Sequence, residues 1–158
     1  MLQYLSKNES IETHKMFDIF CHQVSITGRN DDDLTREIFS VYPEVQKEYQ
    51  KVIDNRRTCL GDNLYVRASD NRVCVSMFSK HEYGKCLHTD FGGLAMCFER
   101  IEKKLKISAP NLIVGFQYLM GEKNNTEEWD VIESMIKTLS EKAEQQICIV
   151  QPFEYYPT

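Results

Sequence analysis

The stretch Phe17-Asp-Ile-Phe-Cys-His-Gln-Val24 decides the fold of this chain. It is apolar nearly throughout, which is typical of a central strand buried on both faces of a sheet. The loop Ser25-Ile-Thr-Gly-Arg-Asn-Asp-Asp-Asp33 follows, and the apolar spacing of Leu34–Val41 then predicts a short helix. A strand that leads through a loop into a helix is the repeating unit of α/β domains.

The rest of the chain continues this alternation. The expected strands are Leu2–Leu5, Phe17–Val24, Asn63–Ala68, Arg72–Phe78, Asn111–Phe116 and Ile147–Phe153. The expected helices are Leu34–Val41, Pro43–Val52, one with apolar positions from Leu94 to Leu105, and one from Trp129 to Ala143. Ser69-Asp-Asn71 predicts a hairpin turn and the polar segment Ser79–Thr89 predicts a loop. We therefore expect one α/β domain over residues 1–158, in three α/β/α layers around a mixed central sheet.

Composition narrows the class of protein. The formal net charge of -5 disfavours a nucleic-acid partner that binds through bulk charge. No apolar run approaches the roughly 20 residues of a membrane helix, and Met1–Lys7 lacks the apolar core of a signal peptide. We expect a cytoplasmic protein without a membrane partner, and the sequence does not indicate an oligomeric state.

The cysteines give no sign of a metal or a cofactor. None of them forms a Cys-x-x-Cys pair, and most lie in apolar patterns, which predicts reduced, buried thiols without a zinc site. They are Cys21, Cys59, Cys74, Cys86, Cys97 and Cys148.

Three segments are expected at the carboxyl ends of strands, where open α/β sheets bind ligands. They are Ser25–Asp33, Ser79–Thr89 and Gln117–Glu128. Phosphate loops in such positions are usually glycine-rich, so that backbone N–H groups can approach the anion. The first and third segments are instead rich in carboxylates. Because two like charges 4 Å apart repel by about 4 kcal/mol at an effective dielectric near 20, these acids must face away from an anionic ligand or hold a cation.

Several individual side chains can each be interpreted as structural or as functional. We expect His22 to be a core histidine rather than a general base, with Cys21 on the opposite face of the sheet. Asp31–Asp33 predicts a helix N-cap with solvated neighbours, and a divalent-cation site is the alternative. Lys80 is expected on a solvated loop, and contact with a phosphate or nucleophilic catalysis is the alternative. Tyr83 fits a ligand wall or a packing turn equally well.

The order of four stretches resembles a macro domain, the fold that recognises ADP-ribose. The similarity is to the subgroup of ADP-ribose-1''-phosphate phosphatases and small ADP-ribosyl-hydrolases, and it runs from about Phe17 to Phe153. The four stretches are Cys21-His-Gln-Val24, Ile38-Phe-Ser-Val-Tyr-Pro-Glu-Val-Gln-Lys-Glu-Tyr49, Met77-Phe-Ser-Lys-His-Glu-Tyr-Gly84 with Thr89-Asp-Phe91, and Gly121 with Trp129 eight residues on.

The resemblance implies a ligand site and a set of residues for it. The candidate ligand-binding residues are Ser25, Gly28, Arg29, Tyr83, Gly121 and Asn125. No catalytic residue is assigned, and Lys80 and Asn125 are the candidates for one. The chain departs from the family at several of them. Ser25 stands where an Asn is usual, Asn125 stands where some hydrolases have an Asp, and most loop glycines are replaced.

Three functions follow from these observations. The first is binding or hydrolysis of an ADP-ribose-type small nucleotide. The second is a non-catalytic interaction domain whose cleft has lost that ligand, which the acidic loops favour. The third is a metal-dependent hydrolase that uses the run Asp31–Asp33.

Overall fold

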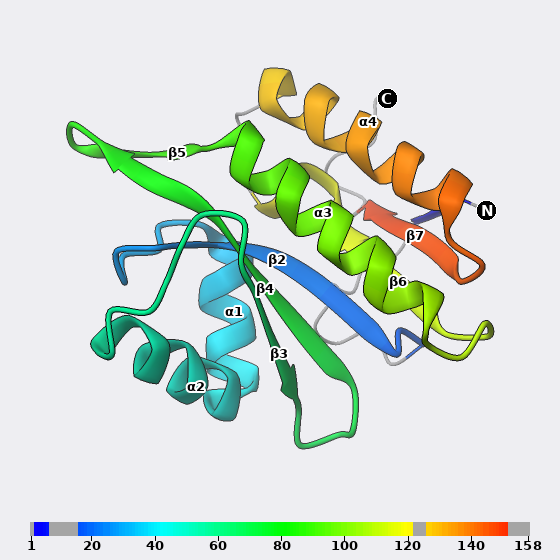
Figure 1. Ribbon diagram of the computed structural model, residues 1–158, viewed down its shortest axis with the longest axis horizontal. Helices are drawn as coiled ribbons and strands as arrows, with labels where there is room; N and C mark the ends of the chain where they lie inside the picture. Colours follow the sequence, from blue (N-terminus) through cyan, green and yellow to red (C-terminus); the bar gives the residue numbers. More distant parts are fainter. Residues whose placement is uncertain (1, 7–15, 122–125, 152–158) are drawn as a thin grey trace.

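The computed structural model describes residues 2–6, 16–121 and 126–151. Its strands are Leu2–Ser6 (β1), Ile19–Ser25 (β2), Asn63–Arg67 (β3), Val73–Tyr83 (β4), Cys86–Thr89 (β5), Ile113–Gln117 (β6) and Gln146–Gln151 (β7). Its helices are Asp33–Val41 (α1), Pro43–Asp54 (α2), Phe91–Lys106 (α3) and Thr126–Lys142 (α4), with a 3-10 turn at Tyr118–Gly121 (η1). Figure 1 shows their arrangement.

The strands form one mixed sheet in the order β1-β7-β6-β2-β4-β3, and β5 pairs with β4 beyond this path. β2 lies at the centre, parallel to both β6 and β4. The pairs β3–β4 and β4–β5 are antiparallel. The expected mixed α/β sheet is therefore confirmed, with the apolar strand that follows Phe17 at its centre.

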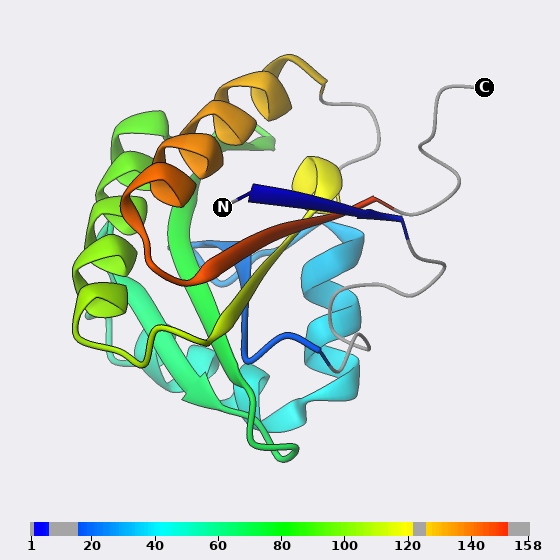
Figure 2. The same cartoon turned by 90° about the vertical axis from the view of Figure 1, so that its right-hand side faces the viewer.

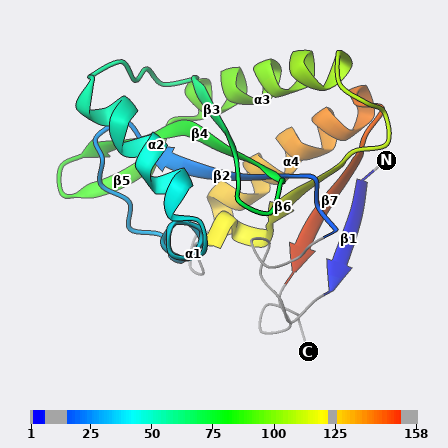
Figure 3. The same cartoon turned by 90° about the horizontal axis from the view of Figure 1, so that it is seen from below.

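Helices cover both faces of this sheet, as Figures 2 and 3 show. One apolar core joins α3 and α4 to the face that carries Cys21, Val75 and Phe116. A second core joins α1 and α2 to the opposite face, which carries Phe20 and Cys74. The three-layer α/β/α prediction is confirmed, because alternate residues of β2 contact different helix pairs.

The prediction of a loop at Ser79–Thr89 is wrong. β4 continues to Tyr83, and β5 pairs back on it with Lys80 opposite Thr89 and Tyr83 opposite Cys86. Gly84 closes the hairpin at φ +66°, a conformation that glycine adopts without strain. The polar composition misled the sequence interpretation because the outer part of this hairpin is exposed to solvent, so its strands need no apolar residues.

Local signals fix the helix starts. The side chain of Asp32 caps α1 by accepting a hydrogen bond from the Thr35 N–H at 2.8 Å, and Asp90 caps α3 in the same way at Gly93. Pro43 stands in the first turn of α2. In the described part of the chain, no helix has the length and apolar character required to cross a membrane.

Candidate functional site

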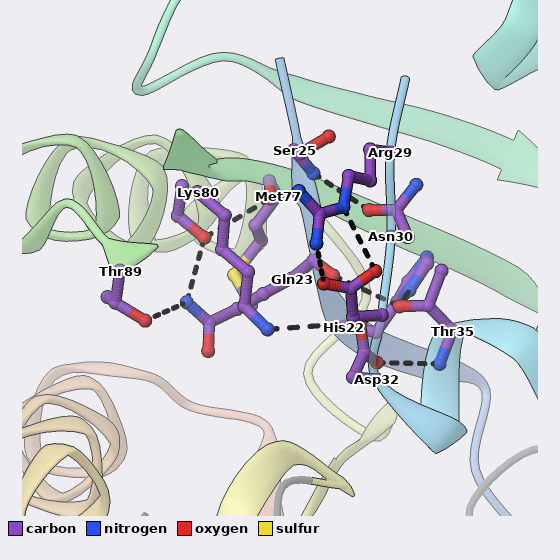
Figure 4. Close-up of polar contacts among 12 residues, drawn as sticks. His22, Gln23, Ser25, Arg29, Asn30, Asp32, Thr35, Met77, Lys80 and Thr89 are labelled. Atoms are coloured by element: carbon purple, nitrogen blue, oxygen red, sulfur yellow. Dashed lines mark hydrogen bonds and ion pairs between the residues drawn. The ribbon is translucent and has the colours of Figure 1, made fainter. Parts of the chain in front are cut away.

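Buried polar side chains gather at the carboxyl ends of β2 and β4. Most of the fully or nearly buried polar residues of the described chain lie there. They are His22, Gln23, Ser25, Asp32, Thr35, Ser76, Ser79, Lys80 and Thr89. Burying polar groups costs free energy unless each finds a partner, so such a concentration is unusual for a purely structural core. Figure 4 shows the network that they form.

A register shift at the end of β2 shapes this edge. The regular pairing of β2 with β4 holds up to Val24 opposite Phe78, and Ser25 then lies opposite Lys80. The extra residue on β4 is a β-bulge, a feature found often beside active sites because it redirects a side chain. Here it accompanies the turn of the chain from β2 into the loop that begins at Ser25.

Lys80 forms a buried ion pair with Asp32. Its Nζ lies 3.8 Å from Oδ1 of Asp32, and the two side chains are only 4% and 2% exposed. Oδ2 of the same carboxylate caps α1, whereas Oδ1 accepts no hydrogen bond from the described residues. The expectation that Lys80 lies on a solvated loop is wrong: strand β4 carries it into the protein, where the Asp32 charge compensates its own.

The aspartate run is neutralised by cations of the chain itself. Arg29 donates two hydrogen bonds to Asp31, the shorter of 2.9 Å. Lys80 pairs with Asp32, and Arg36 lies 3.5 Å from Asp33. The acidic loop therefore does not present three uncompensated negative charges at this edge. The capping role predicted for the run is confirmed at Asp32.

Backbone N–H groups of the first loop, Ser25–Asp33, donate hydrogen bonds to side chains of the same loop. The N–H of Ser25 donates to Oδ1 of Asn30 at 2.9 Å, and the N–H of Thr27 donates to the Ser25 hydroxyl at 3.3 Å. The N–H of Arg29 donates to the Thr27 hydroxyl at 3.4 Å. In phosphate-binding loops such groups point at the anion instead. Asn30, which the sequence interpretation did not single out, also donates to the Tyr49 hydroxyl and so ties the loop to α2.

His22 is a core histidine, as expected. Nδ1 lies 2.9 Å from the Thr35 hydroxyl and Nε2 lies 2.6 Å from the Ser76 hydroxyl. Thr35 donates its one hydroxyl proton to the Gln23 carbonyl, so Nδ1 of His22 carries the ring proton and Nε2 accepts from Ser76. Burial, together with the Lys80 charge, lowers the pKa of His22 to about 3. The ring is therefore neutral at physiological pH.

A second polar chain crosses the opposite face of the sheet. Nε2 of Gln23 donates to the hydroxyls of Ser79 and Thr89 at 3.0 and 3.2 Å. The Thr89 hydroxyl donates to Oε2 of Glu128 at 3.0 Å. This chain joins β2, the β4–β5 hairpin and the first turn of α4, and it directs one acid of the third segment into a structural contact. No sequence pattern linked these residues, because they are far apart along the chain.

The carboxyl end of β6 has an unusual backbone. Leu119 and Met120 in η1 have φ angles of 58° and 49°, a left-handed conformation that costs roughly 1–2 kcal/mol per non-glycine residue. Both side chains are buried in the core under α3 and α4, which holds the backbone in place. Strained residues of this kind cluster at ligand sites. Gly121 ends this turn, while Asn125 lies outside the described residues.

The β4–β5 hairpin lies beside the first loop. Glu82 accepts a hydrogen bond from the Thr27 hydroxyl and lies 3.9 Å from the Arg29 guanidinium. Tyr83 is next in the strand, so its ring points to the other face, where it contacts His81 and His88 edge-on. Its side chain is 76% exposed. The structure thus brings Ser25, Gly28, Arg29 and Lys80 together, and the ligand role expected for each of them and for Tyr83 stays a prediction.

In the described part of the chain the potential metal ligands do not cluster, and most thiols are buried. Across residues 2–6, 16–121 and 126–151, no three His, Cys, Asp or Glu side chains are arranged to hold a metal ion. The six cysteines are free; Cys59 and Cys86 are exposed and the other four are buried. Burial raises the pKa of the Cys97 thiol to about 12, which makes it a poor nucleophile.

Comparison with known proteins gives a structural match without a sequence match. No protein-family model matches the chain, and no curated protein matches it in sequence. The macrodomain of Thermus aquaticus DarG superposes with a TM-score of 0.75 at 14% identity, with 99% of each chain covered. That of Mycobacterium tuberculosis DarG gives 0.74 at 13% identity, over 95% of this chain and 97% of the other.

A third solved structure contains a ligand. Thermosipho africanus DarTG in complex with ADP-ribose superposes with a TM-score of 0.73 at 14% identity, over 99% of this chain and 43% of that one. Identities this low reveal shared architecture rather than shared chemistry. The order of strands, the helix layers and these superpositions agree: the chain has the macrodomain fold.

Proposed function

We propose that the chain binds an ADP-ribose-type nucleotide at the carboxyl ends of β2, β4 and β6. The observation that carries the proposal is the neutralised aspartate run: each of Asp31, Asp32 and Asp33 is paired with a cation of the chain. An anionic ligand therefore meets a nearly neutral edge. The fold is shared with a protein solved in complex with ADP-ribose, which supports this choice of ligand class.

Arg29 is the side chain best suited to the diphosphate. Its side chain is 45% exposed, and its guanidinium binds Asp31 through a fork of two hydrogen bonds. A guanidinium has five N–H donors, so Arg29 can keep its hydrogen bonds to Asp31 and still donate to a phosphate oxygen. Gly28, at φ 93°, gives the loop a backbone turn beside it. On this proposal Ser25, Gly28 and Arg29 border the ligand on one side and Gly121 with Asn125 borders it on the other.

We further propose that the chain hydrolyses this ligand, as do the ADP-ribose-1''-phosphate phosphatases and ADP-ribosyl-hydrolases that the sequence resembles. Lys80 is the candidate catalytic group because it is the buried cation nearest the first loop. Its partner Asp32 holds it beside Ser25 at the end of β2. In this role Lys80 stabilises negative charge that develops on the ligand as a bond breaks.

A second function is favoured by a specific observation. Three N–H groups of the first loop donate to side chains of that loop, and Asn30 closes it against Tyr49. A loop closed in this way suits a non-catalytic interaction domain that has lost the nucleotide. The two functions differ in whether an anion displaces these internal hydrogen bonds.

Calorimetric titration with ADP-ribose at low and physiological salt tests the proposal. Binding in the micromolar to millimolar range is expected, and Arg29→Gln should weaken it about 5- to 10-fold, as loss of a charged hydrogen-bond donor does. Lys47→Gln, on the exposed surface of α2, is the matched control and should bind as the wild type does. Absence of heat and of a melting shift at millimolar ADP-ribose would reject nucleotide binding and leave the interaction domain.

A further inference from the structure

A cavity lies at the opposite end of the sheet from the proposed nucleotide site. It measures about 580 Å³ and lies among the start of β2, the β3–β4 hairpin and the last turns of α3. Figure 1 shows that the β3–β4 turn is at the far end of β4 from the β4–β5 hairpin. Small-molecule sites usually measure roughly 300–1,000 Å³, so the cavity has the size of a binding site. Its apolar floor is made by Ile19, Tyr65, Val73, Val75, Ile101 and Leu105.

The carboxylates at this cavity are already engaged. Asp70 accepts a hydrogen bond of 3.0 Å from Nε of Arg72, and that guanidinium lies 4.8 Å from the centre of the Phe20 ring. Oδ2 of Asp18 accepts the Ile113 N–H at 2.8 Å and so joins the starts of β2 and β6. Both acids therefore have structural partners.

Two cations at the same cavity are not neutralised. Within the described chain, neither Arg67 nor Lys104 has a carboxylate at ion-pair distance. Arg67 donates to the Asn71 carbonyl at 2.8 Å. Nζ of Lys104 lies 4.1 Å from the centre of the Tyr65 ring. In a chain of net charge -5 this is a local excess of positive charge, and it borders an apolar surface of which Ile19, Tyr65 and Val73 are half-buried.

Tyr65 and Lys104 together determine which class of ligand the cavity can bind. The Tyr65 ring forms part of the cavity wall and packs against the core under α3, so its position is fixed. The Lys104 ammonium covers the face of this ring, so a flat aromatic ligand in the cavity contacts the edge of Tyr65, and a carboxylate attached to the ligand reaches the ammonium. A neutral aromatic molecule gains only the first interaction, and an aromatic cation is repelled.

We propose that this cavity is a binding site for a small aromatic carboxylate, with Lys104 as its anion contact and the edge of the Tyr65 ring as its aromatic contact. The site is independent of the nucleotide site, because the two lie at opposite ends of β4 and share no residue.

Titration with 2-naphthoate, followed by amide chemical shifts in NMR spectra, tests the site. A dissociation constant on the order of 1 mM is expected for a probe of this size, with shifts centred on Tyr65, Val73 and Ile101. Lys104→Met should weaken 2-naphthoate about 5- to 10-fold and leave neutral 2-naphthol unchanged. Lys103→Met is the matched control, since Lys103 is one residue away and lines a different groove.

A second variant tests the site independently, in case Lys104→Met alters the structure of α3. Ser108→Trp, at a half-buried lining position just beyond the end of α3, should fill the mouth of the cavity and abolish the shifts while the protein stays folded. ADP-ribose should not displace 2-naphthoate. The site is rejected if the shifts at 10 mM probe avoid this cavity, or if binding is the same in Lys104→Met, Ser108→Trp and the wild type.

Discussion

Nζ of Lys80 lies 3.8 Å from Oδ1 of Asp32, and both side chains are almost fully removed from solvent. The pair links the end of β4 to the first turn of α1, at the point where the chain leaves the central strand. A buried pair of this kind does not add much stability by itself. Its importance is that removal of the Lys80 charge alone leaves the Asp32 carboxylate buried without its cation.

Lys80→Met should therefore lower the free energy of unfolding by about 3–5 kcal/mol. Asp32→Asn combined with Lys80→Met should recover at least about 2 kcal/mol of this loss, because the asparagine still caps α1 and no buried charge remains. Urea unfolding of the wild type, both single variants and the double variant measures the coupling. Additive losses would show that the two charges do not interact.

The lowered pKa of His22 predicts that the protein loses stability in acid. Its folded-state pKa of about 3 is below the ordinary histidine pKa of 6.5, so the unfolded chain binds a proton between these pH values and the folded chain does not. The stabilisation is complete above about pH 6.5 and is lost as the pH falls towards 3, by about 2–3 kcal/mol at pH 4.5. His22→Gln should reduce the stability difference between pH 7 and pH 4.5 by that amount. His88→Gln, which replaces an exposed histidine, is the control, and equal pH dependence in all three proteins would contradict the assignment.

Asn30 predicts how the first loop responds to an anion. Asn30→Gly frees the Ser25 N–H and removes the bond to Tyr49, so the free energy of unfolding should fall by about 1–2 kcal/mol. If the nucleotide binds at this loop, its affinity should rise about 5- to 10-fold, because a backbone donor no longer has an internal partner. Calorimetry with ADP-ribose measures this change. Asn55→Gly, at the exposed end of α2, is the control, and unchanged affinity in Asn30→Gly would mean that the Ser25 N–H does not contact the ligand.

The space around Gly115 in β6, beside the central strand, is too small for a larger side chain. A Cβ at this position would lie 2.8 Å from Cγ of Phe17, whose ring is fully buried. Gly115→Ala should cost about 1–3 kcal/mol of unfolding free energy, because an overpacked core must shift. Gly92→Ala in α3 is the control: its nearest neighbour is 3.5 Å away, and alanine favours a helix. Thermal unfolding compares the two, and equal melting temperatures would show that Phe17 moves freely.

Much of the fold could be predicted from local patterns. The apolar run up to Val24 marked the central strand, and the periodicity of Leu94 to Leu105 marked α3. The Ser79–Thr89 hairpin could not be recognised in this way, because its strands are stabilised by pairing and not by an apolar face. Because this segment was predicted to be a loop, Lys80 was wrongly expected to be exposed to solvent.

The sequence by itself determined the layers of this protein, since the periodicity of apolar residues dictates which faces of strands and helices must be buried. It also determined that the loops after β2 and β6 are acidic and poor in glycine. Only the tertiary structure decided what those acids do. Whether a carboxylate repels an anion or is neutralised depends on distances of a few ångströms to cations elsewhere in the chain, and Asp32 and Lys80 are 48 positions apart in the sequence.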